Sequence, residues 1–336
     1  MGFISNIIDN KMIKGANKYK LLAVIMLLLL AKGCNLFYVA VRNVPVFFSS
    51  PEKIKNKIKN PVRDDVRLSA LWIGHSTVLL QLDDKVIITD PVLTETVGEL
   101  ARRVVEPGID VDNIPRCDLI LISHPHFDHL SFGSLEELEE KSSGAPLVFP
   151  AGLEYYLPKM DFDFIKMDND NGYQSRIIGE KKNINGIEVT TVYAQHWGGR
   201  YGLDGYVWGN RAYTGYIIQY HGMTVYFAGD TGYDSVKFIQ LGNKFDIDLA
   251  FIPIGPCAQC SQFGTPNHIF PPESVQIFKD IKARWMVPIH YGTMFFAQAD
   301  AMKPVETLNE IIKSDKLREK IFPLKIGGQK IFINKH

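Results

Sequence analysis

The chain has 336 residues, of which 46% are apolar, so it can bury the core of one large α/β domain or of two small ones. Its 37 lysines and arginines balance its 37 aspartates and glutamates, and this zero net charge argues against a nucleic-acid or acidic-polymer partner. The four cysteines are too few for a disulfide framework in a chain of this size.

Residues 1–42 have the layout of a signal or anchor segment. Four lysines between positions 11 and 20 precede an uncharged apolar run at 21–31. Either residues 31–34 form a lipoprotein cleavage box that leaves Cys34 lipidated, or the apolar run continues as an uncleaved anchor. The alternative is a buried helix of a soluble domain. Because the basic residues precede the run, the positive-inside rule predicts membrane association with an extracytoplasmic catalytic domain.

Residues 43–67 are rich in proline and lysine and are interpreted as a linker leading off the membrane. Its lysines either touch anionic head groups or remain solvated. The folded domain is expected to span residues 68–336. It begins with two β-rich runs, 70–82 and 86–91, which are joined by a short acidic turn.

A dense group of possible metal ligands follows the next predicted strand, at 117–122. In the stretch Ser123-His124-Pro125-His126-Phe127-Asp128-His129-Leu130, three histidines and one carboxylate occupy six positions. Such a loop can aim imidazole and carboxylate groups at two adjacent cations. We interpret it as half of a binuclear metal site at the carboxyl end of a strand, where α/β proteins usually carry their sites. A polar loop with hydrogen-bonded histidines is the alternative.

The remaining elements alternate between strands and helices. A capping box at Ser134–Glu137 predicts a helix beyond it, and a strand and a helix are expected at 147–150 and from 151. Later strands are predicted at 186–193, 216–220, 223–228, 249–254 and 285–289, with His221 in a turn and a helix at 272–283. Two β-rich halves with helices outside them predict an α/β fold, a four-layer αβ/βα sandwich preceded by the N-terminal membrane segment.

Three later residues can complete the metal site. One loop supplies at most four ligands, and two cations need more. His196, Asp230 and His290 each follow a predicted strand, which is the position that the first loop also occupies. We therefore expect all three to join the first loop as metal ligands.

With these residues in place, the sequence resembles the metallo-β-lactamase superfamily and, within it, the N-acylphosphatidylethanolamine-hydrolysing phospholipase D-like family. The resemblance spans about Leu68 to the C-terminus. Besides the histidine loop, it is carried by Trp72–Val78, Thr89–Pro91, Gln195–Trp197 with Arg200, Trp208-Gly209, Phe227–Tyr233, Pro253–Gly255, His268 with Pro272-Glu273, and Ile289–Thr293.

The resemblance implies two zinc ions per chain. One would be held by His124, His126 and His196, and the other by Asp128, His129 and His290, with Asp230 as the bridge. His268 would be a histidine beside the metals that is not a ligand. His75 is expected to support a metal ligand or to be structural.

The implied activity is that of a membrane-associated, zinc-dependent phosphodiesterase of phospholipase D type. A metal-bound hydroxide would hydrolyse N-acylphosphatidylethanolamine or a related phospholipid. Asp128 would also orient the hydroxide, while His268 would donate to the leaving oxygen, grip the phosphoryl group, or only support a metal ligand. A lactonase or amidase of the same fold is an alternative, and so is a non-catalytic, membrane-tethered metal-binding protein.

The chain departs from the family pattern at two places. Tyr291 stands where the family usually has tryptophan, and Cys257-Ala258-Gln259-Cys260 replaces part of the substrate wall. The cysteine pair is isolated, so ordinary loop cysteines or a local disulfide are expected rather than a zinc ribbon or a thioredoxin-type site.

Overall fold

The computed structural model describes residues 50–97, 101–168, 176–201, 204, 207, 211–294 and 300–335. Residues 50–336 form one compact unit, and the signal or anchor segment predicted at 1–42 lies outside the described residues. In the described part of the chain, no helix combines the length and the apolar character needed to cross a bilayer.

The compact unit includes residues that the sequence pattern assigns to the linker. The backbone amide of Glu52 donates to the carbonyl of Val104. Lys57 forms ion pairs with Glu106, at 3.3 Å, and with Asp110, at 2.9 Å. The packed part of the chain therefore begins ahead of residue 68.

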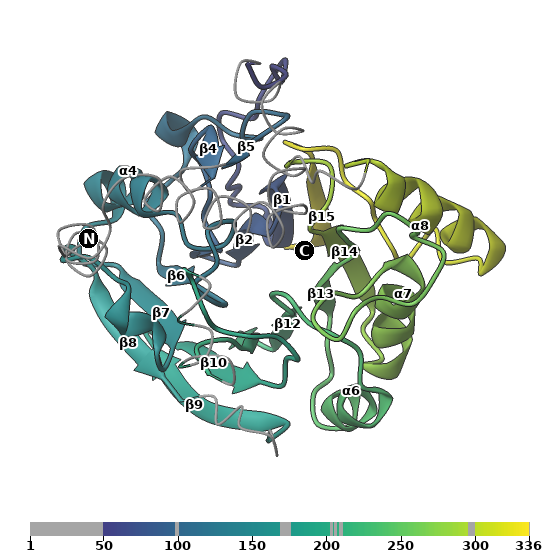
Figure 1. Cartoon of the computed structure of the whole chain (residues 1–336). Helices are drawn as coiled ribbons and strands as arrows, with labels where there is room; N and C mark the ends of the chain where they lie inside the picture. The colour runs from purple at the N-terminus through teal and green to yellow at the C-terminus, as the bar shows by residue number, and fades with distance from the viewer. Residues whose placement is uncertain are drawn as a thin grey trace, which may run out of the picture. The chain divides into compact units, whose positions relative to one another are not determined.

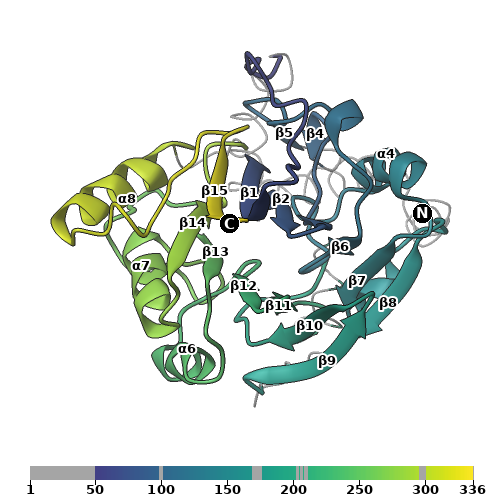
Figure 2. The same ribbon diagram turned by 180° about the vertical axis from the view of Figure 1, so that it is seen from behind.

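Two mixed β-sheets form the centre of the unit (Figures 1 and 2). The first sheet has the strand order β15-β1-β2-β3-β6-β7-β8, and the second has the order β14-β13-β12-β11-β10-β9. The first consists of β15 (Gln329–Asn334), β1 (Val66–Gly74), β2 (Thr77–Leu82), β3 (Lys85–Thr89), β6 (Leu119–Leu121), β7 (Pro146–Pro150) and β8 (Asp163–Met167). The second consists of β14 (Trp285–Ile289), β13 (Leu249–Pro253), β12 (Met223–Phe227), β11 (Gly215–Tyr220), β10 (Ile187–Val192) and β9 (Ile178–Ile184). A separate two-stranded ribbon pairs β4 (Thr96–Val97) with β5 (Ala101–Arg102).

The inner strands of the first sheet are largely apolar on both faces because both faces are covered. Along β1, Leu68, Ala70 and Trp72 join the core shared with the second sheet, whereas Leu71 and Ile73 join a second core. That second core contains Leu135 and Leu138 of α4 (Phe132–Ser142). Successive side chains of a strand point to opposite faces, so this alternation places one sheet against each side of a common core and α4 on the outside.

Three helices lie beside the second sheet: α6 (Ser235–Gly242), α7 (Pro271–Asp280) and α8 (Lys303–Ser314). Their apolar residues, among them Phe238, Ile277 and Leu308, pack into the same cluster as the strands of that sheet (Figure 1). The layers therefore run helix, sheet, sheet, helix, as the alternation of elements predicts.

Two local predictions were wrong near the first sheet. The run at 70–82 is two strands, because the chain turns at Gly74 and His75, where φ is 127° and 52°. Helix α4 begins after Ser131, not Ser134. The Ser131 hydroxyl accepts the amide of Ser134, while the buried Ser134 hydroxyl accepts the amide of Leu93 and is unavailable as a cap.

The helix predicted from residue 151 was also wrong. Only a single 3₁₀ turn forms there, at Leu153–Tyr155, after Gly152 in a left-handed conformation. Short 3₁₀ turns are common as connectors between longer elements, and this one leads from β7 towards β8.

Candidate metal centre

The first ligand group is formed by His124 and His126 of the loop after β6 and by His196 after β10. His124 Nε2 lies 2.9 Å from His126 Nδ1, and His196 Nε2 lies 3.2 Å from the same nitrogen. Tetrahedral zinc with bonds of 2.0–2.1 Å holds its ligand nitrogens about 3.3 Å apart. The two separations are close to this value, and the ligand atoms of all three residues lie within 4.8 Å of one another, near enough for one cation.

The second ligand group is formed by Asp128, His129 and His290. Asp128 Oδ2 lies 3.8 Å from His129 Nε2 and 3.8 Å from His290 Nε2. Asp230 lies between the two groups. Its Oδ2 is 3.4 Å from His129 Nε2 and 3.2 Å from His290 Nε2, and it is also 3.9 Å from His196 Nε2 and 4.0 Å from His124 Nε2. One carboxylate oxygen is thus within reach of both groups.

Strand direction explains why residues so far apart in sequence meet. Strands β12, β13 and β14 are parallel, and β10 runs the same way because two antiparallel pairings separate it from β12. His196, Asp230 and His290 follow the ends of β10, β12 and β14, so they emerge at one edge of the second sheet. At this edge they meet the four candidate ligands of the loop after β6, so all seven predicted ligands are brought together.

The donor set fits a divalent cation. It consists of imidazole nitrogens and carboxylate oxygens, which are the ligands that zinc and related metals take from proteins. Among the described residues, Asp230 Oδ1 is buried without a hydrogen-bond partner. Buried polar atoms are normally hydrogen-bonded, so this carboxylate oxygen indicates a further positively charged partner.

The protonation states differ between the two groups. Burial lowers the pKa of His126 to about 4 and the pKa values of His124 and His196 well below the usual value. These imidazoles are therefore neutral at neutral pH, which is the form that binds metals. Burial has the same tendency at His129, but Asp230, Asp128 and Asp90 outweigh it and raise the pKa of His129 well above its ordinary value.

Several residues orient the ligands from behind. Asp90 Oδ2 lies 2.7 Å from His129 Nδ1 and accepts the Ser123 hydroxyl at 2.6 Å, and that hydroxyl lies 2.9 Å from His124 Nδ1. Sequence reasoning gave Asp90 no role. The available signal was a carboxylate directly after the buried strand β3, the same position that His290 occupies after β14.

Arg200 fixes the backbone of the histidine loop. Its Nη1 donates to the carbonyls of Pro125, at 2.5 Å, and Leu130, at 3.0 Å, which lie towards the two ends of the loop. The guanidinium also lies over the rings of Phe127 and Phe132, 4.3 and 4.4 Å from their centroids. A buried cation thus holds the loop in the conformation that presents its ligands.

His268 lies beside the centre on the segment between β13 and α7. Its Nδ1 is 3.5 Å from Asp230 Oδ2, and its side chain is 30% exposed.

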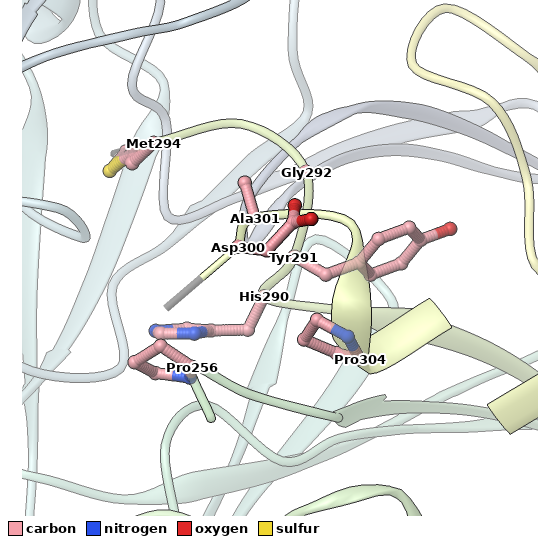
Figure 3. Close-up of a pocket in the computed structure, with 8 residues that line it drawn as sticks. All are labelled: Pro256, His290, Tyr291, Gly292, Met294, Asp300, Ala301 and Pro304. Carbon is pink, nitrogen blue, oxygen red and sulfur yellow. The ribbon is translucent and has the colours of Figure 1, made fainter. Parts of the chain in front are cut away.

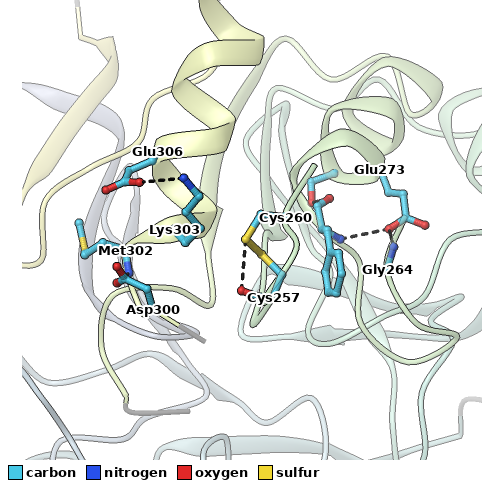
Figure 4. The surroundings of a disulfide bond; sticks show 10 residues. Cys257, Cys260, Gly264, Glu273, Asp300, Met302, Lys303 and Glu306 are labelled. Atoms are coloured by element: carbon cyan, nitrogen blue, oxygen red, sulfur yellow. Dashed lines mark hydrogen bonds and ion pairs between the residues drawn. A yellow bond between two sulfur atoms is a disulfide. The ribbon is translucent and has the colours of Figure 1, made fainter. Parts of the chain in front are cut away.

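Figure 4 shows two bonds that fix the segment between β13 and α7: Cys257 and Cys260 form a disulfide, and Glu273 Oε2 accepts the amide of Gly264 at 2.6 Å. The sequence predicted either ordinary loop cysteines or a local disulfide, and the structure has the local disulfide. The carbonyl of Asn267, on the same segment, lies 3.0 Å from His196 Nδ1.

A small pocket adjoins the second ligand group (Figure 3). His290 and Pro256 lie side by side in it, and Met294, Asp300, Ala301 and Pro304 also line it. The Tyr291 side chain stacks on Trp72, with ring centroids 4.4 Å apart. Tyr291 is therefore a packing residue beside the pocket.

Comparisons with known proteins agree with this fold and site. A family model described as "Beta-lactamase superfamily domain" matches residues 85–291. A "UPF0173 metal-dependent hydrolase" of Exiguobacterium is 30% identical over 236 residues, covering 70% of this chain and 90% of the relative. A metallo hydrolase structure from Ignicoccus hospitalis superposes with a TM-score of 0.55 at 22% identity, covering 79% of this chain and 98% of that chain.

Two further relatives carry a substrate in their names. The "N-acyl-phosphatidylethanolamine-hydrolyzing phospholipase D 1" of Caenorhabditis elegans is 30% identical over 255 residues, covering 73% of this chain and 70% of the relative. The mitochondrial N-acyl-phosphatidylethanolamine-hydrolyzing phospholipase D of Saccharomyces cerevisiae is 28% identical over 271 residues. That match covers 78% of this chain but only 55% of the yeast protein.

The fold and the ligand cluster together define a metal-dependent hydrolase. The chain belongs to the beta-lactamase superfamily, within which it is similar to the two phospholipases D.

Proposed function

We propose that this protein is a zinc-dependent phosphodiesterase of phospholipase D type that hydrolyses N-acylphosphatidylethanolamine or a related phospholipid at a membrane surface. The observation that carries the proposal is the position of Asp230 Oδ2, within 4.0 Å of imidazole nitrogens from both ligand groups. The similarity to two phospholipases D supports the substrate class.

The proposal includes two zinc ions per chain. His124, His126 and His196 would hold one, while Asp128, His129 and His290 would hold the other, with Asp230 shared. When bound, such a pair of cations supplies Lewis acidity, which ionises water near neutral pH and offsets charge on phosphoryl oxygens. A side-chain nucleophile is then unnecessary.

The chain's own residues supply orientation and proton transfer. Burial raises the pKa of Asp128, but His129, His75 and His290 outweigh it and hold that pKa well below the usual range. Asp128 is therefore ionised at neutral pH and can accept a hydrogen bond from the attacking water, which it thereby orients.

His268 acts as a neutral hydrogen-bond donor in this proposal. Burial lowers its pKa, so the imidazole is uncharged at neutral pH. Its partly exposed side chain lies next to Asp230, where a phosphoryl group would approach. A neutral imidazole there can grip a phosphoryl oxygen or donate to the leaving oxygen.

The proposed location is extracytoplasmic, with the chain held at the membrane by residues 1–42. The Cys257–Cys260 disulfide supports this location, because disulfides persist in oxidising compartments and are rare in reducing ones. Fractionation of cells that express the full-length chain, with protease added from outside the cytoplasmic membrane, tests it. Cleavage of the domain in intact cells is expected, and protection until the cells are lysed would contradict the location.

The activity is tested with the purified full-length chain and vesicles that contain N-acylphosphatidylethanolamine. Release of phosphatidic acid is expected, with loss on chelation, recovery on addition of zinc, and two zinc ions per chain by elemental analysis. Asp230→Asn should abolish release. The matched control is Asp112→Asn, since the Asp112 side chain is fully exposed and lies outside the centre.

Three results would contradict the proposal in different ways. Release that is indifferent to the chelator would exclude metal-dependent chemistry. Hydrolysis of lactones or amides without release of phosphatidic acid would favour the alternative, a lactonase or amidase of the same fold. A folded chain with less than one zinc ion would favour a non-catalytic protein.

A further inference from the structure

The turn between β1 and β2 places a strained histidine against the metal centre. His75 has φ of 52° and follows Gly74, whose φ is 127°. Non-glycine residues rarely adopt this left-handed region, and such strain persists only where the surrounding structure fixes it. The His75 side chain is fully buried, so its conformation is set by the protein and not by solvent.

Three hydrogen bonds fix the backbone of His75. Its amide donates to the Thr293 hydroxyl at 2.7 Å. Its carbonyl accepts the amide of His290 at 3.0 Å and the indole of Trp72 at 2.9 Å. Two of these partners lie on the segment that carries the ligand His290, so the turn is tied directly to the second ligand group.

The imidazole of His75 points at Asp128. His75 Nε2 lies 3.1 Å from Asp128 Oδ2, and the ring centroids of His75 and His290 are 3.9 Å apart. An ionised carboxylate can only accept hydrogen bonds, so Nε2 carries the proton and donates it. Although His75 lies within 4.8 Å of the ligand atoms of Asp128, His129 and His290, its Nε2 is thereby occupied.

We propose that His75 is a positioning residue, which directs Asp128 Oδ2 at the second cation through the Nε2–H···Oδ2 hydrogen bond. Asp128 is on a loop and its side chain is 24% exposed, so its carboxylate needs a partner to hold one orientation. Partners of this kind orient metal ligands and contribute to metal affinity. The inference rests on the metal-dependent site and not on the choice of substrate.

The experiment separates the imidazole from the backbone. In His75→Asn, the new residue tolerates the left-handed backbone, but its amide reaches only the position of Nδ1 and loses Asp128. In His75→Gln, the amide nitrogen reaches the position of Nε2 and restores the donor. The matched control is His221→Asn, because His221 also has a left-handed backbone, at φ of 47°, and its Nδ1 also contacts a carboxylate, Asp83, at 2.9 Å, but far from the centre.

Zinc binding to the metal-free, full-length variants is measured by competition with a chromophoric chelator, without substrate, alongside thermal unfolding. In His75→Asn, we expect the affinity for one of the two ions to fall by about 10–100-fold. His75→Gln should regain most of that loss, and His221→Asn should leave both affinities unchanged.

Unchanged affinities in His75→Asn would overturn the proposal, as would a loss in His75→Gln equal to that in His75→Asn when both unfold at the wild-type temperature. If His75→Asn does not fold, His75→Gln decides alone. Affinity near that of the wild type supports the role, and a loss of tenfold or more with unchanged unfolding refutes it. Since no substrate is present, failure here is distinct from failure of the phospholipase activity.

Discussion

The two ligand groups share one carboxylate oxygen but differ in charge and in spacing. The first group has three neutral imidazoles, with nitrogens 2.9 and 3.2 Å from that of His126. The second has the carboxylate of Asp128 and two imidazoles at 3.8 Å, and its His129 has a raised pKa. A cation can enter the first group without displacing a proton. In the second it has to displace one, so the two positions are chemically unequal.

The largest effect is expected where the two groups join. Asp230→Asn removes the negative charge and one oxygen of the carboxylate that lies within 4.0 Å of ligands from both groups. We expect both metal positions to lose their cations. Activity should fall by more than the loss of about 10–100-fold that removal of a supporting partner causes. Elemental analysis and a hydrolysis assay measure it. Retention of one full equivalent of metal would mean that Asp230 serves only one group.

Substitution of one ligand in each group separates the positions. His196→Ala should leave the second group able to bind, and His290→Ala should leave the first. Each variant is therefore expected to bind about one cation, against the two proposed for the wild type. Chelator competition should give a different affinity for each remaining position. Equal affinities would contradict the expectation that the two ligand groups bind cations differently.

A smaller loss is expected from the residue behind His129. Asp90→Asn weakens the acceptor of the 2.7 Å contact with His129 Nδ1. Cation affinity should fall by about 10–100-fold, mainly at the second group. The His196→Ala and His290→Ala backgrounds report the second and the first group separately. A loss confined to the first group would show that Asp90 acts through Ser123 and His124 instead.

The pH dependence of binding should also differ between the groups. Below the raised pKa of His129, the metal-free second group holds a proton that a cation expels, so its affinity should rise about tenfold per pH unit. The lowered pKa values of His124, His126 and His196 predict nearly constant affinity at the first group between pH 6 and 8. Chelator titrations of His196→Ala and His290→Ala across that range compare the slopes, and parallel slopes would contradict the assigned proton.

The smallest effect is expected next to the centre but outside it. Tyr291→Phe removes the hydroxyl that donates to the carbonyl of Leu324 at 2.7 Å and retains the stack on Trp72. The free energy of unfolding should fall by about 1 kcal/mol, with cation affinity unchanged. Denaturant unfolding measures the first quantity. A change in metal binding would give Tyr291 a role beyond packing.

The sequence predicted the clustering of the candidate ligands and the order of the layers because both leave local signals. A loop with three histidines and one aspartate in six positions is conspicuous, and strands covered on both faces are apolar along their whole length. The same continuous apolar character hid the turn at Gly74 and His75. An isolated glycine inside an apolar run is a weak turn signal, and the turn is stabilised by Thr293 and His290, far along the chain.

Supporting contacts could not be predicted because they depend on which strands become neighbours. Asp90 meets His129 because β3 and β6 pair in parallel, and Arg200 reaches the histidine loop only through the packing of the two sheets. Side-chain identity signals possible chemistry, whereas sheet order decides which side chains meet.

Strand β15 has a consequence for how the protein is made. It pairs with β1, from Val66 with Asn334 to Leu71 with Gln329, so the strand that leads into the His75 turn is flanked by a segment that is translated after all seven ligand residues. A nascent chain still lacking Gln329–Asn334 has an open edge at β1. We therefore expect a chain halted before Gln329 to bind metal ions less tightly than a chain that contains β15, which an elemental analysis of the two chains would measure.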